Sequence, residues 1–171
     1  MNLNEHLNCK MNSTIKKANY KDARLLTNLI RKSFKDVAKR FNLTKKNTPT
    51  HPSNCSTEWI EDALDKGIRY YILEFQNKPC GCIALEIAQP DICYLERLAV
   101  LLKYRKKGFG KALVNHLIQE ARDMKIKRIE IGIIAENIEL KKWYEKFGFM
   151  EIKTVEFDHL PFNVSFMFKN L

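Results

Sequence analysis

The stretch Arg105-Lys106-Lys107-Gly108-Phe109-Gly110-Lys111 stands between an apolar run that ends at Leu102 and an amphipathic pattern that begins near Lys111. A diphosphate is held best by converging backbone N–H groups, nearby positive charge and the N-terminus of a helix. Gly108 and Gly110 let the backbone come close to such an anion, because neither carries a Cβ atom. The stretch therefore predicts a pyrophosphate-binding loop between a strand and a helix.

The two commonest phosphate-binding signatures do not fit this stretch. A P-loop has Ser or Thr where Ala112 stands, and a dinucleotide fingerprint has a third glycine where Leu113 stands. The plain alternative is a strand-to-helix turn with a solvated basic edge. The seven residues alone leave both interpretations open.

The composition indicates an ordinary globular protein. Of its 171 residues 45% are hydrophobic and 29% are charged, which suits one domain with a substantial core. We expect a polar tail over residues 1–12 and a single domain over residues 13–171. The net charge of +10 favours an acidic partner such as a phosphorylated cofactor or a nucleic acid, although a lysine-rich composition explains it more simply.

The cysteines and the hydropathy pattern favour a cytoplasmic protein without metal. Five cysteines stand at no disulfide-scaffold spacing, and no apolar signal segment leads the chain, which predicts reduced thiols. Cys80-x-Cys82 has no second Cys/His pair at zinc-site spacing. No apolar run approaches the roughly 18 residues of a membrane span.

Hydrophobic periodicity predicts an α/β protein of the mixed-sheet, α+β type. The turns at 76–79 and 89–91 make the strands around them an antiparallel meander. A strand-helix-strand crossover then places the strand over 126–135 parallel to the one over 92–102. In chain order we expect a strand over 13–18, a helix over 20–41, a loop over 42–56, a helix over 58–66, strands over 69–75, 80–88 and 92–102, the helix after the basic loop, a strand over 126–135, a helix over 137–147, and a hairpin over 149–157 and 163–169.

The loop over 42–56 is long for a compact domain, and loops of this length are often functional. We interpret it as a lid over a substrate. His51 and Cys55 in it suggest a Cys-His nucleophile, but no orienting carboxylate accompanies them and their spacing in a loop fixes no geometry.

The motif order in the second half resembles the GNAT superfamily of acyl-CoA-dependent N-acyltransferases. Arg-x-x-Gly-x-Gly lies between a strand and a helix, and a parallel strand, Asn137, Tyr144 and Phe147-Gly148-Phe149 follow. The match runs from about Tyr94 to Phe149, and the upstream order of elements is similar as well. The resemblance implies an acetyl-CoA-dependent N-acetyltransferase with about four helices around a mostly antiparallel sheet, which has one parallel pair and splays at the cofactor site.

The resemblance also assigns the cofactor-binding residues. Asn137 would bind the pantetheine from one side, and Tyr144 would be the general acid that protonates the coenzyme A thiolate. On the other side, Leu98, Ala99 and Val100 would offer backbone groups to the pantetheine, with the N–H of Val100 or a neighbour polarising the thioester. The pyrophosphate would lie in the loop formed by Arg105, Lys106, Lys107, Gly108, Phe109, Gly110 and Lys111.

The attacking amine must lose a proton, since an alkylammonium has a pKa of about 10.4, and a carboxylate can take it directly or through water. Glu96 is the candidate base, because strict alternation gives it the side-chain parity of Leu98. Each assignment has a structural alternative. Glu96 suits a salt-bridged strand carboxylate, Tyr144 a core aromatic residue, and Asn137 a plain helix N-cap.

The acceptor is expected to be a small-molecule or peptide amine. Family members that acetylate ribosomal protein N-termini resemble this loop region but carry a glutamate where Gly132 stands, which disfavours that activity. Two rivals stay open: an acyl-CoA-binding regulatory module without turnover and, ranked last, a nucleic-acid-binding protein. We expect no nucleic acid and no membrane as partners, and homodimers are common in such proteins.

Overall fold

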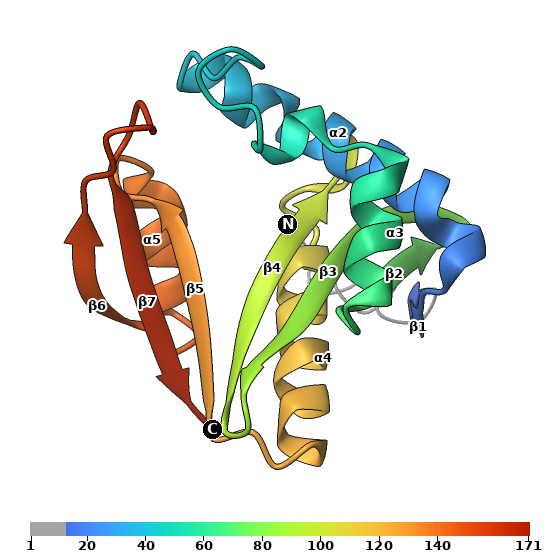
Figure 1. Ribbon diagram of the computed structural model, residues 1–171. Helices are drawn as coiled ribbons and strands as arrows, with labels where there is room; N and C mark the ends of the chain where they lie inside the picture. Colours follow the sequence, from blue (N-terminus) through green and yellow to red (C-terminus); the bar gives the residue numbers. More distant parts are fainter. Residues whose placement is uncertain (1–12) are drawn as a thin grey trace.

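Seven strands form one mixed sheet in the order β1-β2-β3-β4-β5-β7-β6 (Figure 1). The computed structural model describes residues 13–171, so the predicted tail over residues 1–12 lies outside the described residues. The sheet confirms the predicted mixed, mostly antiparallel class. Its strands are β1 (Ser13–Lys17), β2 (Arg69–Phe75), β3 (Lys78–Gln89), β4 (Ile92–Val100), β5 (Arg128–Ile134), β6 (Met150–Val155) and β7 (Val164–Asn170).

Four α-helices among the described residues cover the two faces of the sheet. They are α2 (Ala23–Arg40), α3 (Thr57–Asp65), α4 (Phe109–Asp123) and α5 (Ile138–Glu145), with single 3-10 turns at η1 (Tyr20–Asp22), η2 (Pro52–Asn54) and η3 (Leu102–Tyr104). One buried cluster joins α4 and α5 to one face, and a second joins α2 and α3 to the other. Burial on both faces fits the largely apolar strands β2 and β3.

Two predicted boundaries around the basic loop were displaced. The strand ends at Val100, because Leu102–Tyr104 forms the turn η3, and the helix begins at Phe109. Gly108 has a φ of 87°, a left-handed conformation that glycine adopts without strain, and it reverses the chain directly before α4. Phe109 is buried, which adds a core contact to the first turn of the helix.

The predicted parallel pair is present but short. β4 and β5 pair in register at Ile92 with Arg128, Cys93 with Ile129, and Tyr94 with Glu130, which covers only the first third of β4. Beyond these pairs the two strands diverge, as the wedge between them in Figure 1 shows. The predicted splay of the sheet is therefore confirmed.

A β-bulge interrupts β4 in the middle of the divergent segment. Cys82 pairs with Ala99, and Ala84 pairs with Glu96. A single residue of β3 therefore stands opposite two residues of β4, Arg97 and Leu98. Arg97 itself adopts a φ of 51°. The extra residue shifts the alternation of side chains along β4 by one.

The bulge corrects the parity argument for Glu96. Glu96 lies opposite Ala84, which belongs to the α2/α3 core, whereas Leu98 packs against the α4 core. The two side chains therefore lie on opposite faces of the sheet, and strict alternation was the wrong assumption.

Candidate active site

A cavity of about 560 Å³ occupies the wedge between β4 and β5. Elements from both halves of the chain contribute to its wall, which is mainly apolar. The described lining residues are Phe34, Val37, His51, Pro52, Tyr94, Leu95, Glu96, Arg97, Leu98, Glu130, Ile131, Gly132, Ile133, Ile134, Asn137, Leu140, Tyr144, Phe162, Val164 and Phe166. We call this cavity the cleft.

The basic loop brings the N-terminus of α4 to this region directly after β4. Lys106 and Gly108 both have positive φ values, 62° and 87°. No side chain caps α4, so no capping side chain competes for the N–H groups of its first turn. This geometry suits an anion, as the sequence analysis expected.

Gly110 lies where α4 packs against α5. A Cβ atom at this position would lie 3.4 Å from the Trp143 ring, an ordinary van der Waals distance. Lys106, Lys107 and Lys111 are exposed. Their charge is therefore available at the mouth of the loop.

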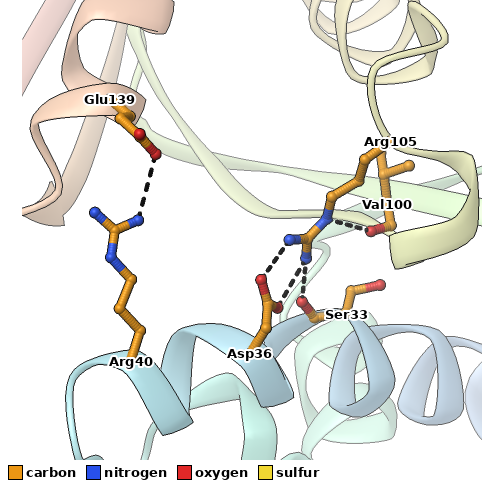
Figure 2. Close-up of polar contacts among 6 residues, drawn as sticks. All are labelled: Ser33, Asp36, Arg40, Val100, Arg105 and Glu139. Atoms are coloured by element: carbon orange, nitrogen blue, oxygen red, sulfur yellow. Dashed lines mark hydrogen bonds and ion pairs between the residues drawn. The ribbon is translucent and has the colours of Figure 1, made fainter.

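The side chain of Arg105 binds protein groups and not an open pyrophosphate site (Figure 2). Its guanidinium donates to both carboxylate oxygens of Asp36, at 2.5 and 3.0 Å, and to the carbonyl oxygen of Ser33 at 2.5 Å. Its Nε donates to the carbonyl oxygen of Val100 at 3.0 Å. The side chain thus ties the loop to α2 and to the end of β4, and we call this contact the Arg105 clasp.

The end of β4 turns the N–H of Val100 toward the side of β5, while the Val100 carbonyl accepts from Arg105. The N–H of Leu101 donates to the carbonyl of Cys80, and orientations alternate along an antiparallel ladder. The N–H and C=O of Val100 therefore point away from β3, on the side where β4 and β5 have diverged. Of the other expected pantetheine contacts, Leu98 belongs to the bulge, and the same alternation turns the backbone groups of Ala99 toward β3.

Asn137 and Tyr144 lie on the opposite wall of the cleft. Asn137 is the N-cap of α5, where its side-chain oxygen accepts a hydrogen bond from the N–H of Leu140 at 3.4 Å. Tyr144 follows two turns later on the same side of the helix. The structure thus brings both predicted residues to the cleft while Asn137 also serves as a cap.

The Tyr144 phenol is almost entirely buried, with 4% of the residue exposed. Its ring packs edge-on against Trp143 and Phe149. Burial raises the pKa of the phenol above its ordinary value, so it is protonated at neutral pH. Within residues 13–171 it has no hydrogen-bond partner.

His51 and Cys55 do not form a nucleophilic pair in the structure. The Nδ1 of His51 lies 2.8 Å from the Ser53 hydroxyl, and the Cys55 thiol donates to the carbonyl of Ser56. Burial lowers the pKa of His51 to about 4 and raises that of Cys55, so the imidazole is neutral and the thiol protonated at neutral pH. His51 does line the cleft, beside Phe34 of α2.

Sequence reasoning missed two residues that the structure places at the cleft or its rim. Arg97 lines the cleft, but the bulge that turns it there leaves no pattern in the sequence. Asp36 binds Arg105 across 69 positions, and a carboxylate on a helix gives no sign of so distant a partner.

The described residues show neither a metal centre nor a membrane span. Within residues 13–171 no three His, Cys, Asp or Glu side chains gather so that they could hold a metal ion. In that same part of the chain no helix combines the length and apolarity needed to cross a membrane.

A comparison with known protein families decides the assignment. The model of the acetyltransferase (GNAT) family matches residues 24–149, most of the chain. The chain belongs to the GNAT family. The match covers nearly all of α2, the strands from β2 to β5, the basic loop and α5.

Curated relatives of this GNAT chain are distant. An uncharacterized N-acetyltransferase, YvbK of Bacillus subtilis, is 29% identical over 103 residues, which cover 60% of this chain and 65% of that protein. The amino-acid acetyltransferase of Neisseria meningitidis is 30% identical over 107 residues, covering 62% of this chain and 22% of that protein. The chain thus matches less than two thirds of the length of these relatives.

Solved structures agree with the fold. The ribosomal-protein-alanine N-acetyltransferase of Brucella melitensis superposes with a TM-score of 0.70 at 22% identity, over 92% of this chain and 99% of that one. The putative acetyltransferase yncA of Salmonella typhimurium, solved with its cofactor acetyl-CoA, gives a TM-score of 0.69 at 19% identity, over 93% and 94%. At these identities the likeness shows the GNAT fold alone.

Proposed function

We propose that the protein transfers an acetyl group from acetyl-CoA, the acyl donor of its family, to a primary amine that attacks directly within the cleft. The proposal rests on one arrangement of three features. The cleft opens where β4 and β5 diverge, with the uncapped N-terminus of α4 beside the end of β4 and the Tyr144 phenol in the opposite wall.

The coenzyme A would be held at two places. The loop over 105–111 offers backbone N–H groups and three exposed lysines to the pyrophosphate. The pantetheine would extend along β4 at Leu98, Ala99 and Val100, where the N–H of Val100 faces it, with Asn137 on the other side from α5. Arg105 would contribute through its backbone and by holding the loop, because its guanidinium is engaged with Asp36.

The acetyl carbonyl would lie near the N–H of Val100, which points away from β3. As the amine nitrogen bonds to the carbonyl carbon, negative charge develops on the carbonyl oxygen. A preorganised N–H donor stabilises this charge by about 3 kcal/mol. The carbon–sulfur bond then breaks and the electron pair stays on sulfur. The products are the acetylated amine and coenzyme A.

Tyr144 would give the coenzyme A thiolate its proton. Burial raises the pKa of this phenol, so it is protonated at neutral pH. It would give up the proton to a thiolate inside the same cleft, because burial raises the pKa of that thiol as well. Glu96, which lines the cleft from the α2 face, would take a proton from the incoming ammonium, directly or through a water molecule. The Glu96 assignment now rests on its position in the cleft and no longer on shared parity with Leu98.

The test is release of free thiol from acetyl-CoA in the presence of amines, comparing wild type with Tyr144→Phe. We expect kcat to fall by about 100-fold or more, the usual contribution of general acid catalysis, while the Kd for acetyl-CoA changes less than twofold. Tyr70→Phe is the matched control, because Tyr70 is a buried tyrosine of the α2/α3 core and does not line the cleft.

Three outcomes separate the alternatives. Equal kcat in wild type and Tyr144→Phe would remove the phenol from the mechanism. Binding of acetyl-CoA without thiol release from any amine would favour the regulatory module instead. Failure to bind acetyl-CoA at all would contradict the whole proposal.

A further inference from the structure

The cleft contains one positive side chain among its described lining residues, and this is Arg97. Two carboxylates also line it. Glu130 is paired with the Nε of Arg128 at 2.9 Å, whereas Glu96 forms no ion pair within residues 13–171. One carboxylate and one guanidinium, adjacent in the chain, therefore remain to meet a ligand.

The bulge in β4 brings these two side chains together. Regular alternation would send neighbouring side chains to opposite faces of the sheet. Arg97 follows the regularly paired Glu96 as the first residue of the bulge, and its φ of 51° breaks the alternation at this point. The charge of Arg97 acts on His51 and Cys55, both on the α2/α3 side where Glu96 lies. Glu96 and Arg97 thus present opposite charges to the same part of the cleft.

The backbone of Arg97 is unusual for this residue type. Its φ of 51° lies in the left-handed region, which few residues other than Gly, Asn and Asp adopt. Such conformations persist where the surrounding structure holds them, and they concentrate at ligand sites. Within β4 this conformation turns Arg97 out of the regular alternation at the bulge.

Two other arginines beside the cleft already have acidic partners (Figure 2). Arg105 is bound by Asp36, and Arg40 pairs with Glu139 at 3.5 Å. The guanidinium of Arg97 forms no hydrogen bond or ion pair with any residue from 13 to 171. The charge of Arg97 acts on Glu86 from a distance, but no carboxylate of the described residues binds the guanidinium directly. A half-buried guanidinium of this kind is completed most favourably by a carboxylate in a two-pronged contact.

We propose that the acceptor is an amino acid, whose carboxylate binds Arg97 while its amino group lies at Glu96. Both side chains belong to adjacent residues and line the same cleft, so a ligand whose amine and carboxylate are joined through one or two carbon atoms can meet both charges. The inference rests on the proposed acetyl transfer and names the substrate class for it.

The same charges disfavour the other amine classes. A polyamine would place a second positive charge near Arg97, which repels it. The cleft offers Glu96 as the one unpaired carboxylate among its described lining residues. A peptide N-terminus has a neutral carbonyl where an amino acid has its carboxylate. In the reaction the ammonium would give a proton to Glu96, the amine would attack the thioester carbon, and the carboxylate would stay bound and unchanged.

The experiment compares matched acceptors that differ only at the carboxylate. Thiol release from acetyl-CoA is measured with the common L-amino acids, their α-carboxamides and the corresponding decarboxylated amines, together with spermidine. For the best amino acid we expect a kcat/KM at least tenfold above that of its carboxamide. Most of this difference should come from a lower KM for the amino acid.

Arg97→Asn is the critical variant, because asparagine tolerates the left-handed backbone of the bulge. It is expected to raise KM for the amino acid at least tenfold and to leave that of the carboxamide and the Kd of acetyl-CoA within twofold. Arg97→Lys keeps the charge without the planar fork and should retain part of the preference. Arg40→Gln, which removes a paired arginine, is the control and should change none of these values.

Equal use of amino acid and carboxamide by the wild type would overturn the inference while leaving acetyl transfer in place. So would an unchanged preference in a folded Arg97→Asn variant, as judged by its melting temperature. Absence of thiol release with every acceptor would contradict both the inference and the proposed function.

Discussion

Gly81 lies where β3 passes closest to the end of β4. A Cβ atom at this position would stand 2.7 Å from the carbonyl oxygen of Ala99, a backbone atom that cannot move aside on its own. The end of β4 at Val100 lies directly beside this contact, since Val100 pairs with Gly81. The absence of a side chain at Gly81 therefore lets β3 approach the end of β4, where the thioester is proposed to bind.

Replacing Gly81 by alanine should destabilise the protein through this clash. We expect a loss of about 1–3 kcal/mol in the free energy of unfolding, typical of overpacking, measured by urea denaturation. Gly132→Ala is the control, because a Cβ there would meet Val164 at 3.4 Å, an ordinary van der Waals distance. Equal stability of Gly81→Ala and wild type would contradict the close approach.

His51 should make the stability of the protein depend on pH. Its pKa is about 4 in the native state against an ordinary value of 6.5, mainly because of burial. Below pH 6.5 the unfolded chain binds a proton that the native state does not, so the free energy of unfolding falls as the pH is lowered toward 4. At 1.36 kcal/mol per pKa unit, the loss between pH 6.5 and 5 is on the order of 2 kcal/mol.

The measurement is urea denaturation at pH 7, 6 and 5. His51→Gln should flatten the decline between pH 7 and 5, whereas His159→Gln, at an exposed position, should leave it unchanged. An equally steep decline in His51→Gln would assign the pH dependence to other groups.

At the scale of elements, α2 is attached to both walls of the cleft. The Arg105 clasp joins it to the basic loop and β4, and the Arg40–Glu139 pair joins it to α5 (Figure 2). The two contacts differ in kind. The clasp combines a two-pronged carboxylate contact with two carbonyl acceptors, while Arg40 and Glu139 meet once, at the surface.

The clasp should therefore contribute to stability and the surface pair should not. In a double-mutant cycle with Arg105→Gln and Asp36→Asn we expect a coupling energy of about 1 kcal/mol or more, typical of hydrogen bonds to charged groups. The cycle with Arg40→Gln and Glu139→Gln should give less than about 0.5 kcal/mol, as exposed pairs do. Comparable coupling in the two cycles would contradict this distinction.

The elements and their order were predictable because local patterns determine them. The spacing of apolar residues changes from a helical period of 3.6 to a strand period of 2 at Arg69, and Gly108 lies in the turn before a helix. These patterns place the strand, the loop, the helix and the parallel strand. The bulge at Arg97 and the Asp36 partner of Arg105 depend on contacts between distant segments. No local pattern carries that information, and the parity of Glu96 was misjudged for this reason.

At the scale of the whole molecule, the cleft divides the sheet into two parts that meet at three β4–β5 register pairs. A cofactor that lies against β4 and the α4 N-terminus on one side, and against Asn137 and Tyr144 on the other, would bridge both parts. Its binding free energy would then stabilise the folded molecule as a unit, because the unfolded chain has no such cleft.

Binding of acetyl-CoA in the cleft should raise the melting temperature of the protein. A ligand at 100 times its Kd adds about 2.7 kcal/mol to the stability of the native state. We predict a melting temperature that rises with acetyl-CoA concentration and shifts less when acetyl-CoA is replaced by free pantetheine, which lacks the pyrophosphate. An unchanged melting temperature at millimolar acetyl-CoA would contradict the account.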